Sequence, residues 1–127
     1  MKGRRTLVWV GGIVIVAVAL ALLTYFSVRL LMPEIVVANQ GQRQIDEVVV
    51  TLPSSRVVFG SIASGQQSTI YYDAEQADGT YQIVISLADG TSISTDCGYV
   101  TNSEVGKGLR ITLSPEFSVQ CQEYQKF

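Results

Sequence analysis

The stretch DGTYQIVISLADG, residues 78–90, decides the fold of this chain. From Tyr81 to Leu87 every second residue is large and apolar, which is the period of a β-strand that buries one face. An Asp-Gly pair stands at each end of the stretch, and Asp-Gly between alternating segments is a strong hairpin signal because both residues tolerate positive φ. The sequence therefore predicts that residues 83–87 pair with residues 93–99.

Shorter strand-like runs lie on both sides of this hairpin. They are apolar or alternating in polarity, and turn sequences such as Asn39-Gln40-Gly41 and Pro53-Ser54-Ser55 separate them. Seven or eight short strands at turn spacings of about 8–12 residues predict a mainly β fold, an immunoglobulin-like antiparallel β-sandwich over residues 33–127. The further runs are residues 35–38, 48–52, 57–59, 69–72, 109–113 and 117–121.

Before the first strand, residues 6–28 (TLVWVGGIVIVAVALALLTYFSV) carry no charge. At helical rise this segment crosses the roughly 30 Å of a bilayer's hydrocarbon core, so we expect a single transmembrane helix over residues 6–32 after a short basic tail, residues 1–5. The alternative is a cleaved signal peptide. The small residues between Ala17 and Ala21 lie inside the apolar run, which is longer than the 7–15 residues typical of a signal, and this favours an uncleaved signal-anchor.

Basic residues are more frequent before the apolar segment than after it. Lys2, Arg4 and Arg5 precede it, whereas Arg29 alone follows closely. Flanks rich in Lys and Arg stay in the cytoplasm, so the sequence predicts a cytoplasmic N-terminus and an extracytoplasmic domain, residues 33–127.

The charge of that domain restricts its partners. The chain as a whole has a net charge of −2, but from Pro33 onward five basic residues face all eleven acidic ones, a net of −6. An acidic domain argues against nucleic acid as a partner. The chain has no histidine, which removes the usual general base and the commonest metal ligand. We therefore expect a protein that is not an enzyme, with no cofactor, metal site or small-molecule substrate.

The two cysteines fall on the strand patterns. Cys97 shares an alternation face with Ile93 and Tyr99, and Cys121 shares one with Phe117 and Val119. Both are expected to face the core, and an extracytoplasmic compartment is oxidising. The sequence predicts a structural disulfide between Cys97 and Cys121, with two buried thiols as the alternative.

Two segments are candidates for other sites. Asp73, Glu75 and Asp78 could form a calcium loop, although their spacing does not match an EF-hand and favours a solvated connection. A possible interaction surface consists of exposed aromatic residues and the loop of residues 101–108. Tyrosines with alternating strand neighbours are also common as core residues or cross-strand pairs, which is the alternative for the three tyrosines. The candidate interaction residues are Tyr71, Tyr72, Tyr99 and Lys107.

Four stretches resemble a known type of protein. They are residues 36–41 (VVANQG), 58–65 (VFGSIASG), 78–81 (DGTY) and 98–101 (GYVT), and the similarity covers most of residues 34–113. They resemble small membrane-anchored bacterial proteins of uncharacterised function. The resemblance implies an immunoglobulin-like sandwich domain in the bacterial envelope, and it brings no active site.

These observations lead to two hypotheses of function. The first is a non-enzymatic, single-pass protein of the bacterial inner membrane whose periplasmic β-sandwich binds another envelope protein, through a sheet edge or end loops. The alternative is a small accessory subunit that stabilises an integral membrane enzyme or transporter through its helix. A periplasmic enzyme or metal carrier would need ligands that the sequence does not supply.

Overall fold

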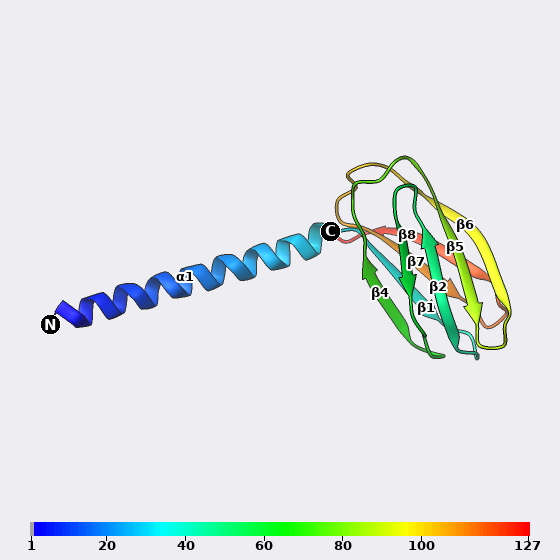
Figure 1. The fold of residues 1–127 in the computed structure, drawn as a ribbon, viewed down its shortest axis with the longest axis horizontal. Helices are drawn as coiled ribbons and strands as arrows, with labels where there is room; N and C mark the ends of the chain where they lie inside the picture. Colours follow the sequence, from blue (N-terminus) through cyan, green and yellow to red (C-terminus); the bar gives the residue numbers. More distant parts are fainter. Residues whose placement is uncertain (1) are drawn as a thin grey trace. The chain divides into compact units, whose positions relative to one another are not determined.

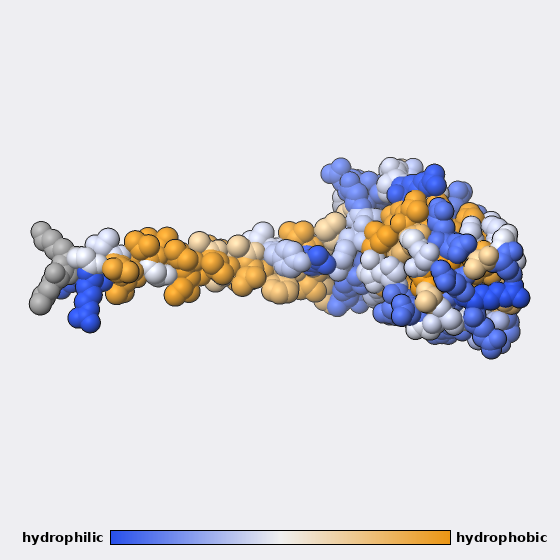
Figure 2. All heavy atoms as spheres, turned by 60° about the horizontal axis from the view of Figure 1, so that its bottom comes forward, coloured by the Kyte–Doolittle hydropathy of each residue, from blue (hydrophilic) through white to orange (hydrophobic). Residues whose placement is uncertain are grey.

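The computed structural model describes residues 2–127 and divides the chain into two units, a helix and a β domain. The helix α1 spans Lys2–Leu31. Within the described residues it is the one helix long and apolar enough to cross a membrane, and an 18-residue window of Gly3–Leu31 has a mean hydropathy of 2.7. Apolar side chains cover most of its length in Figure 2, as expected of a helix that packs in an apolar surrounding.

The helix differs slightly from the predicted segment at both ends. It already includes Lys2, so residues 2–5 of the predicted basic tail belong to the helix instead of preceding it. It ends at Leu31, because Pro33 disfavours the helical conformation at Met32.

The second unit contains eight strands in two four-stranded sheets (Figure 1). One sheet has the order β4-β1-β7-β8 and the other the order β3-β2-β5-β6, so the fold is mainly β and consistent with a sandwich, as predicted. The strands are β1 (Glu34–Asn39), β2 (Ile45–Thr51), β3 (Arg56–Phe59), β4 (Gln67–Tyr71), β5 (Gly79–Leu87), β6 (Ser92–Val100), β7 (Lys107–Leu113) and β8 (Val119–Gln125).

The core is built from the alternation that the sequence shows. Strand β5 pairs with β6 on one side and with β2 on the other, and it turns Tyr81, Ile83, Ile85 and Leu87 inward, each with at most 2% of its surface exposed. The predicted hairpin is thereby confirmed. The opposite sheet contributes its own buried row, which includes Ile35, Val37, Leu109, Ile111 and Leu113.

One strand pair was predicted wrongly. β1 pairs with β7 in parallel, with Glu34 opposite Gly108 and Asn39 opposite Leu113, whereas the sequence predicted antiparallel pairing throughout. Between β1 and β7 the chain builds the other sheet and β4, so β7 can return beside β1 in the same direction. β1 consequently lies between two partners, β4 and β7.

A β-bulge near the end of β6 changes which side chains face the core. Gly79 is opposite Val100, but Tyr81 is opposite Cys97, so β6 carries one extra residue. The bulge forms at Gly98, whose φ is +68°, a left-handed conformation that glycine adopts readily. Tyr99 therefore points outward and Val100 inward, which corrects the prediction that Tyr99 shares the buried face of Cys97.

The start of the last strand was also predicted wrongly. Phe117 does not belong to β8; it has φ +61° in the turn that joins β7 to β8, where its N–H donates to the Ser114 carbonyl. Phe117 is 39% exposed, so it cannot share a buried face with Cys121.

Two buried side-chain amides, those of Asn39 and Gln76, form hydrogen bonds that join loops at the two ends of the sandwich. Asn39 donates from Nδ2 to the carbonyls of Arg43 and Ile62, which joins the loops of residues 40–44 and 60–66. We call this end the far end. Gln76 donates from Nε2 to Ser55 Oγ and accepts from the Ser54 N–H, which joins the loops of residues 52–55 and 72–78.

The end that Gln76 organises also contains the start of β1, and we call it the entry end. Glu34 begins β1 there and pairs with Tyr71, the last residue of β4. The loop of residues 101–106 lies at this end as well, because the Ser103 N–H donates to the Ala74 carbonyl.

Candidate functional site

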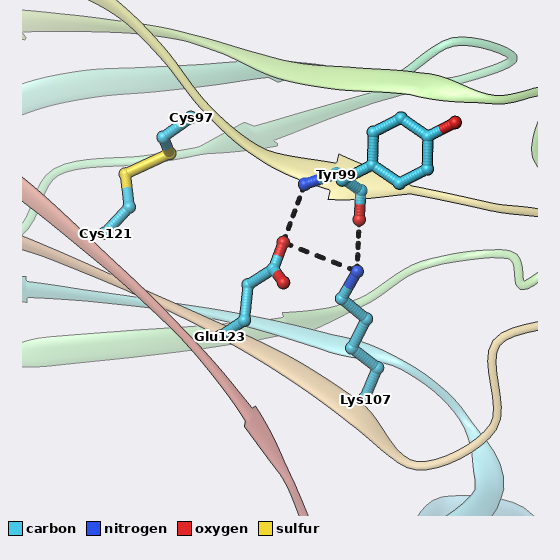
Figure 3. Close-up of a disulfide and its surroundings, with 5 residues drawn as sticks. All are labelled: Cys97, Tyr99, Lys107, Cys121 and Glu123. Carbon is cyan, nitrogen blue, oxygen red and sulfur yellow. Dashed lines mark hydrogen bonds and ion pairs between the residues drawn. A yellow bond between two sulfur atoms is a disulfide. The ribbon is translucent and has the colours of Figure 1, made fainter.

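Strands β6 and β8 lie at the edges of different sheets, and a cysteine pair joins them. Cys97 of β6 and Cys121 of β8 have their sulfur atoms 2.10 Å apart and their Cα atoms 6.3 Å apart, a disulfide (Figure 3). Both residues are half-buried and pack against the core. The pair predicted from the sequence is therefore at bonding distance, and it closes one side of the sandwich.

Charged groups continue this closure towards the entry end. The Tyr99 N–H donates to Glu123 Oε1 at 2.7 Å, a bond from β6 to β8. Lys107 of β7 lies 3.5 Å from the same oxygen and also donates to the Tyr99 carbonyl. In Figure 3 the Glu123 and Lys107 side chains point at the Tyr99 backbone. We call Cys97, Cys121, Tyr99, Lys107 and Glu123 the edge seam.

Glu104, in the loop of residues 101–106, neutralises the cation of the edge seam. Its Oε2 is buried 2.7 Å from Lys107 Nζ, and its Oε1 accepts from both the N–H and the hydroxyl of Thr101, each at 2.7 Å. Burial alone would raise the pKa of the Glu104 carboxyl, but the bonds from Lys107 and Thr101 outweigh it and hold that pKa below its ordinary value.

Two buried tyrosines lie beneath Lys107. The hydroxyls of Tyr72 and Tyr81 are 2.7 Å apart, and the Lys107 ammonium is 5.6 Å from the centre of the Tyr81 ring. Burial raises the pKa of Tyr72 to about 12, and burial together with the Tyr72 hydrogen bond raises the pKa of Tyr81 as well. Both hydroxyls therefore stay protonated near neutral pH, and each is the hydrogen-bond partner of the other inside the core.

The structure separates the four candidate interaction residues into different environments. Tyr72 is 5% exposed and belongs to the core, as the alternative interpretation predicts. The Lys107 side chain is 12% exposed and engaged by two carboxylates, so neither Tyr72 nor Lys107 offers a free surface. Tyr99 is 54% exposed, and Tyr71 is half-buried. Tyr99 and Tyr71 therefore remain candidates for contact with a partner.

A second cluster at the entry end, around Tyr71, was missed from the sequence. The Tyr124 hydroxyl donates to Glu34 at 2.7 Å, and Lys126 Nζ lies 3.9 Å from Glu34 and 5.1 Å from the centre of the Tyr71 ring. The Tyr124 ring covers Gly108 so closely that a Cβ there would clash. The sequence interpretation assigned Gly108 to a loop; a glycine directly before the alternating run 109–113 was a usable sign of such a close approach.

The opposite side of the sandwich has no comparable closure within the described residues. There the edge strands β3 and β4 border a shallow open groove. Val58 is 48% exposed on this side, and Tyr71 belongs to the groove wall. The lining residues include Arg56, Val57, Val58, Ile70, Tyr71 and Asp73. The sandwich is thus asymmetric, with one joined side and one open side.

The acidic segment proposed as a calcium loop forms a local turn. Asp73 Oδ1 accepts the N–H of Glu75 at 2.9 Å, an Asx-turn geometry that explains the residue type without a ligand. Among residues 2–127, no three His, Cys, Asp or Glu side chains are grouped as metal ligands would be.

Comparison with known proteins supports the fold alone. No family model and no curated protein matches the chain. A solved NMR structure of a protein from Eubacterium rectale is similar, with a TM-score of 0.53 and 14% sequence identity, over 74% of this chain and 89% of that one. At this identity the β-rich architecture is shared with a bacterial protein, and nothing about activity follows from the likeness.

Proposed function

We propose that the chain is a single-pass envelope protein that is not an enzyme, in which a membrane-anchored β-sandwich binds another protein. The anchor is supported by α1, which contains a candidate membrane span of 29 residues, Gly3–Leu31, whose apolar window has no buried part in the described structure. A helix that is apolar all round needs an apolar surrounding, and a bilayer core supplies one.

The proposed location is the bacterial inner membrane, with the β-sandwich in the periplasm. Basic residues before the apolar stretch favour a cytoplasmic N-terminus. The cysteine pair at bonding distance supports an oxidising compartment, because disulfides are rare in the cytosol.

The asymmetry of the sandwich carries the binding proposal. The edge strands β6 and β8 are joined by the edge seam. The edge strands β3 and β4 instead border an open groove, and an edge strand has backbone N–H and C=O groups with which a strand of a partner could form hydrogen bonds. Exposed Val58 and half-buried Tyr71 would supply apolar contact beside that strand. We therefore place the partner site on the β3–β4 side.

Site-specific photocrosslinking in intact cells tests this proposal. A photoreactive residue at position 58 is expected to give one discrete adduct, and the same residue at position 120, on exposed Gln120 of β8, is expected to give none. Tyr71→Ala should weaken the adduct from position 58. Equal labelling from positions 58 and 120, or no adduct at matched expression, would contradict the proposal.

The alternative, an accessory subunit that acts through α1, is favoured by one feature of the helix. Gly12 lies in an apolar hollow lined by Val8, Trp9, Ile13 and Val16, and glycine lets a neighbouring helix approach closely. Replacing α1 with an unrelated spanning segment separates the two functions. Loss of the complex would favour the helix, and an unchanged complex would favour the β-sandwich.

A further inference from the structure

Three exposed apolar side chains surround one loop at the entry end. Phe127 is 69% exposed, Tyr99 54% and Val105 48%. We call these three residues the apolar rim. Single exposed apolar residues are ordinary on soluble domains, but several around one loop mark a contact surface.

Hydrogen bonds and one ring contact link the residues of the apolar rim around residues 105–107. Gln125 Nε2 donates to the Val105 carbonyl at 2.6 Å, and the Lys126 N–H donates to the Gly106 carbonyl at 2.9 Å. The Phe127 ring lies against Gly106 so closely that no Cβ would fit there. Lys107, the next residue, donates to the Tyr99 carbonyl. The segments that carry the three side chains are therefore linked to one another.

The apolar rim lies where the chain from α1 enters the domain. Lys107 precedes Gly108, which is the register partner of Glu34, the first residue of β1. Only Met32 and Pro33 separate Glu34 from the end of α1. The Cα atoms of Leu31 and Glu34 are three peptide units apart, at most about 11 Å, so a bilayer that holds α1 would lie within reach of the entry end.

The charges at the entry end decide which kind of lipid surface the apolar rim can contact. The two lysines of this end, Lys107 and Lys126, are paired with Glu104, Glu123 and Glu34 of the same domain. Three exposed carboxylates, those of Asp73, Glu75 and Asp78, lie in the neighbouring loop of residues 72–78 and outnumber the exposed cation beside that loop, Arg56. An anionic surface would be repelled, whereas a zwitterionic one accepts aromatic and apolar side chains at headgroup level.

We propose that the apolar rim inserts into the headgroup region of a zwitterionic phospholipid bilayer, so that the domain rests on the membrane that anchors it. The inference rests on the proposed membrane anchor. Tyr99 and Phe127 contribute the rings that favour this zone, and Val105 adds exposed apolar area. The β3–β4 groove stays available for a protein partner.

Quenching of tryptophan fluorescence by brominated lipids tests the inference on the full chain. The native chain has one tryptophan, Trp9 in α1, so its emission reports on the anchor. The variants Trp9→Phe/Phe127→Trp and Trp9→Phe/Phe117→Trp each place a single indole at the entry end or at the far end. All three chains are reconstituted in nanodiscs of phosphatidylcholine, with and without bromine on the acyl chains.

The expected result is strong quenching of Trp9, loss of most emission at position 127 and unchanged emission at position 117. Admixed anionic lipid should reduce quenching at position 127, because the Asp73–Asp78 loop is repelled. Quenching of Trp9 with no quenching at position 127 would overturn the inference and leave the anchor standing. No quenching of Trp9 would instead overturn the anchor. A blue-shifted but unquenched indole at position 127 would mean that protein covers the apolar rim, which also overturns the inference.

Discussion

Glu123 accepts a hydrogen bond from the backbone N–H of Tyr99, 2.7 Å away, and so ties the last residues of β8 to an edge strand of the other sheet. The bulge at Gly98 makes this possible because it turns the Tyr99 N–H outward from the β5 ladder. A Cβ on Gly98 would lie 2.6 Å from Glu123 and 2.9 Å from the Tyr81 ring. The hydrogen bond therefore depends on glycine at position 98.

Glu123→Ala is expected to destabilise the domain modestly. The change removes a charge-assisted hydrogen bond and one carboxylate next to Lys107, a loss of about 1.5 kcal/mol in the free energy of unfolding. Urea unfolding of the full chain in detergent micelles measures it. Gln120→Ala, on an exposed position of the same strand, is the matched control and should leave the midpoint unchanged.

Removing the disulfide is expected to have a larger effect. Cys97→Ser with Cys121→Ser opens a loop with a sequence separation of 24, and closure of such a loop contributes roughly 3.5 kcal/mol on the chain-entropy model. The unfolding midpoint of the double variant should fall and become insensitive to reducing agent. A native chain whose midpoint does not respond to reducing agent would contradict a stabilising disulfide.

Gly108→Ala is expected to break the contact between Tyr124 and Glu34. The added methyl group would overlap the Tyr124 ring, which must move away from Glu34, and overpacking of this kind costs about 1–3 kcal/mol. Gly60→Ala is the control, since no atom lies within 4 Å of its added Cβ and Gly60 is not at a positive φ. Equal midpoints for the two variants would show that the Tyr124 ring yields without loss.

The loss of folding stability at acidic pH should depend on Glu104. Its pKa is lower in the folded chain than the ordinary 4.5, so the stabilisation is complete above about pH 4.5 and is lost as the pH falls through the lowered pKa. Glu104→Gln should therefore show lower stability near neutral pH and a flatter decline in acid. Unfolding midpoints compared between neutral and acidic buffer measure the difference, and parallel profiles would exclude this role.

The loss of folding stability at alkaline pH should depend on the buried pair of Tyr72 and Tyr81. The pKa of Tyr72 is about 12 in the folded chain against 10.0 unfolded, so the folded state resists ionisation and stability falls as the pH rises from 10 to 12. Tyr72→Phe removes the hydroxyl bond to Tyr81 and should cost about 1 kcal/mol near neutral pH. Its decline in alkali should be shallower than that of the native chain, measured by urea unfolding across this pH range.

Much of the fold can be predicted from the sequence, because burial follows local alternation. The residues from Tyr81 to Leu87 bury every second side chain as the period requires, and the apolar stretch before Pro33 forms a helix. Register is also local where a tight turn joins two strands, as in the β5–β6 hairpin.

The errors occur where one residue leaves the regular conformation. A left-handed Gly98 shifts the alternation of β6 by one position and exposes Tyr99, and a left-handed Phe117 ends the pattern before β8. Neither follows from polarity alone, since alternation assumes an unbroken extended backbone. The parallel pair β1–β7 is non-local and leaves no mark in either strand's own sequence.

The clusters at the entry end were only partly predictable for the same reason. The cysteine pair could be inferred because the strand patterns place both cysteines on core-facing positions. The hydrogen bond from Tyr124 to Glu34 joins residues 90 positions apart. The Gln76 amide accepts a hydrogen bond from a different loop, at Ser54. Both contacts depend on the tertiary structure and leave no local pattern in the sequence.

The position of β1 between β4 and β7 has a mechanical consequence. The chain from α1 enters the sandwich at Pro33, whose carbonyl accepts from the Tyr72 N–H, and continues directly into a strand that is hydrogen-bonded along both sides. Separating β1 from the domain would break two ladders, whereas an edge strand has only one. The helix is thus joined to an interior strand of its sheet and not to an edge strand.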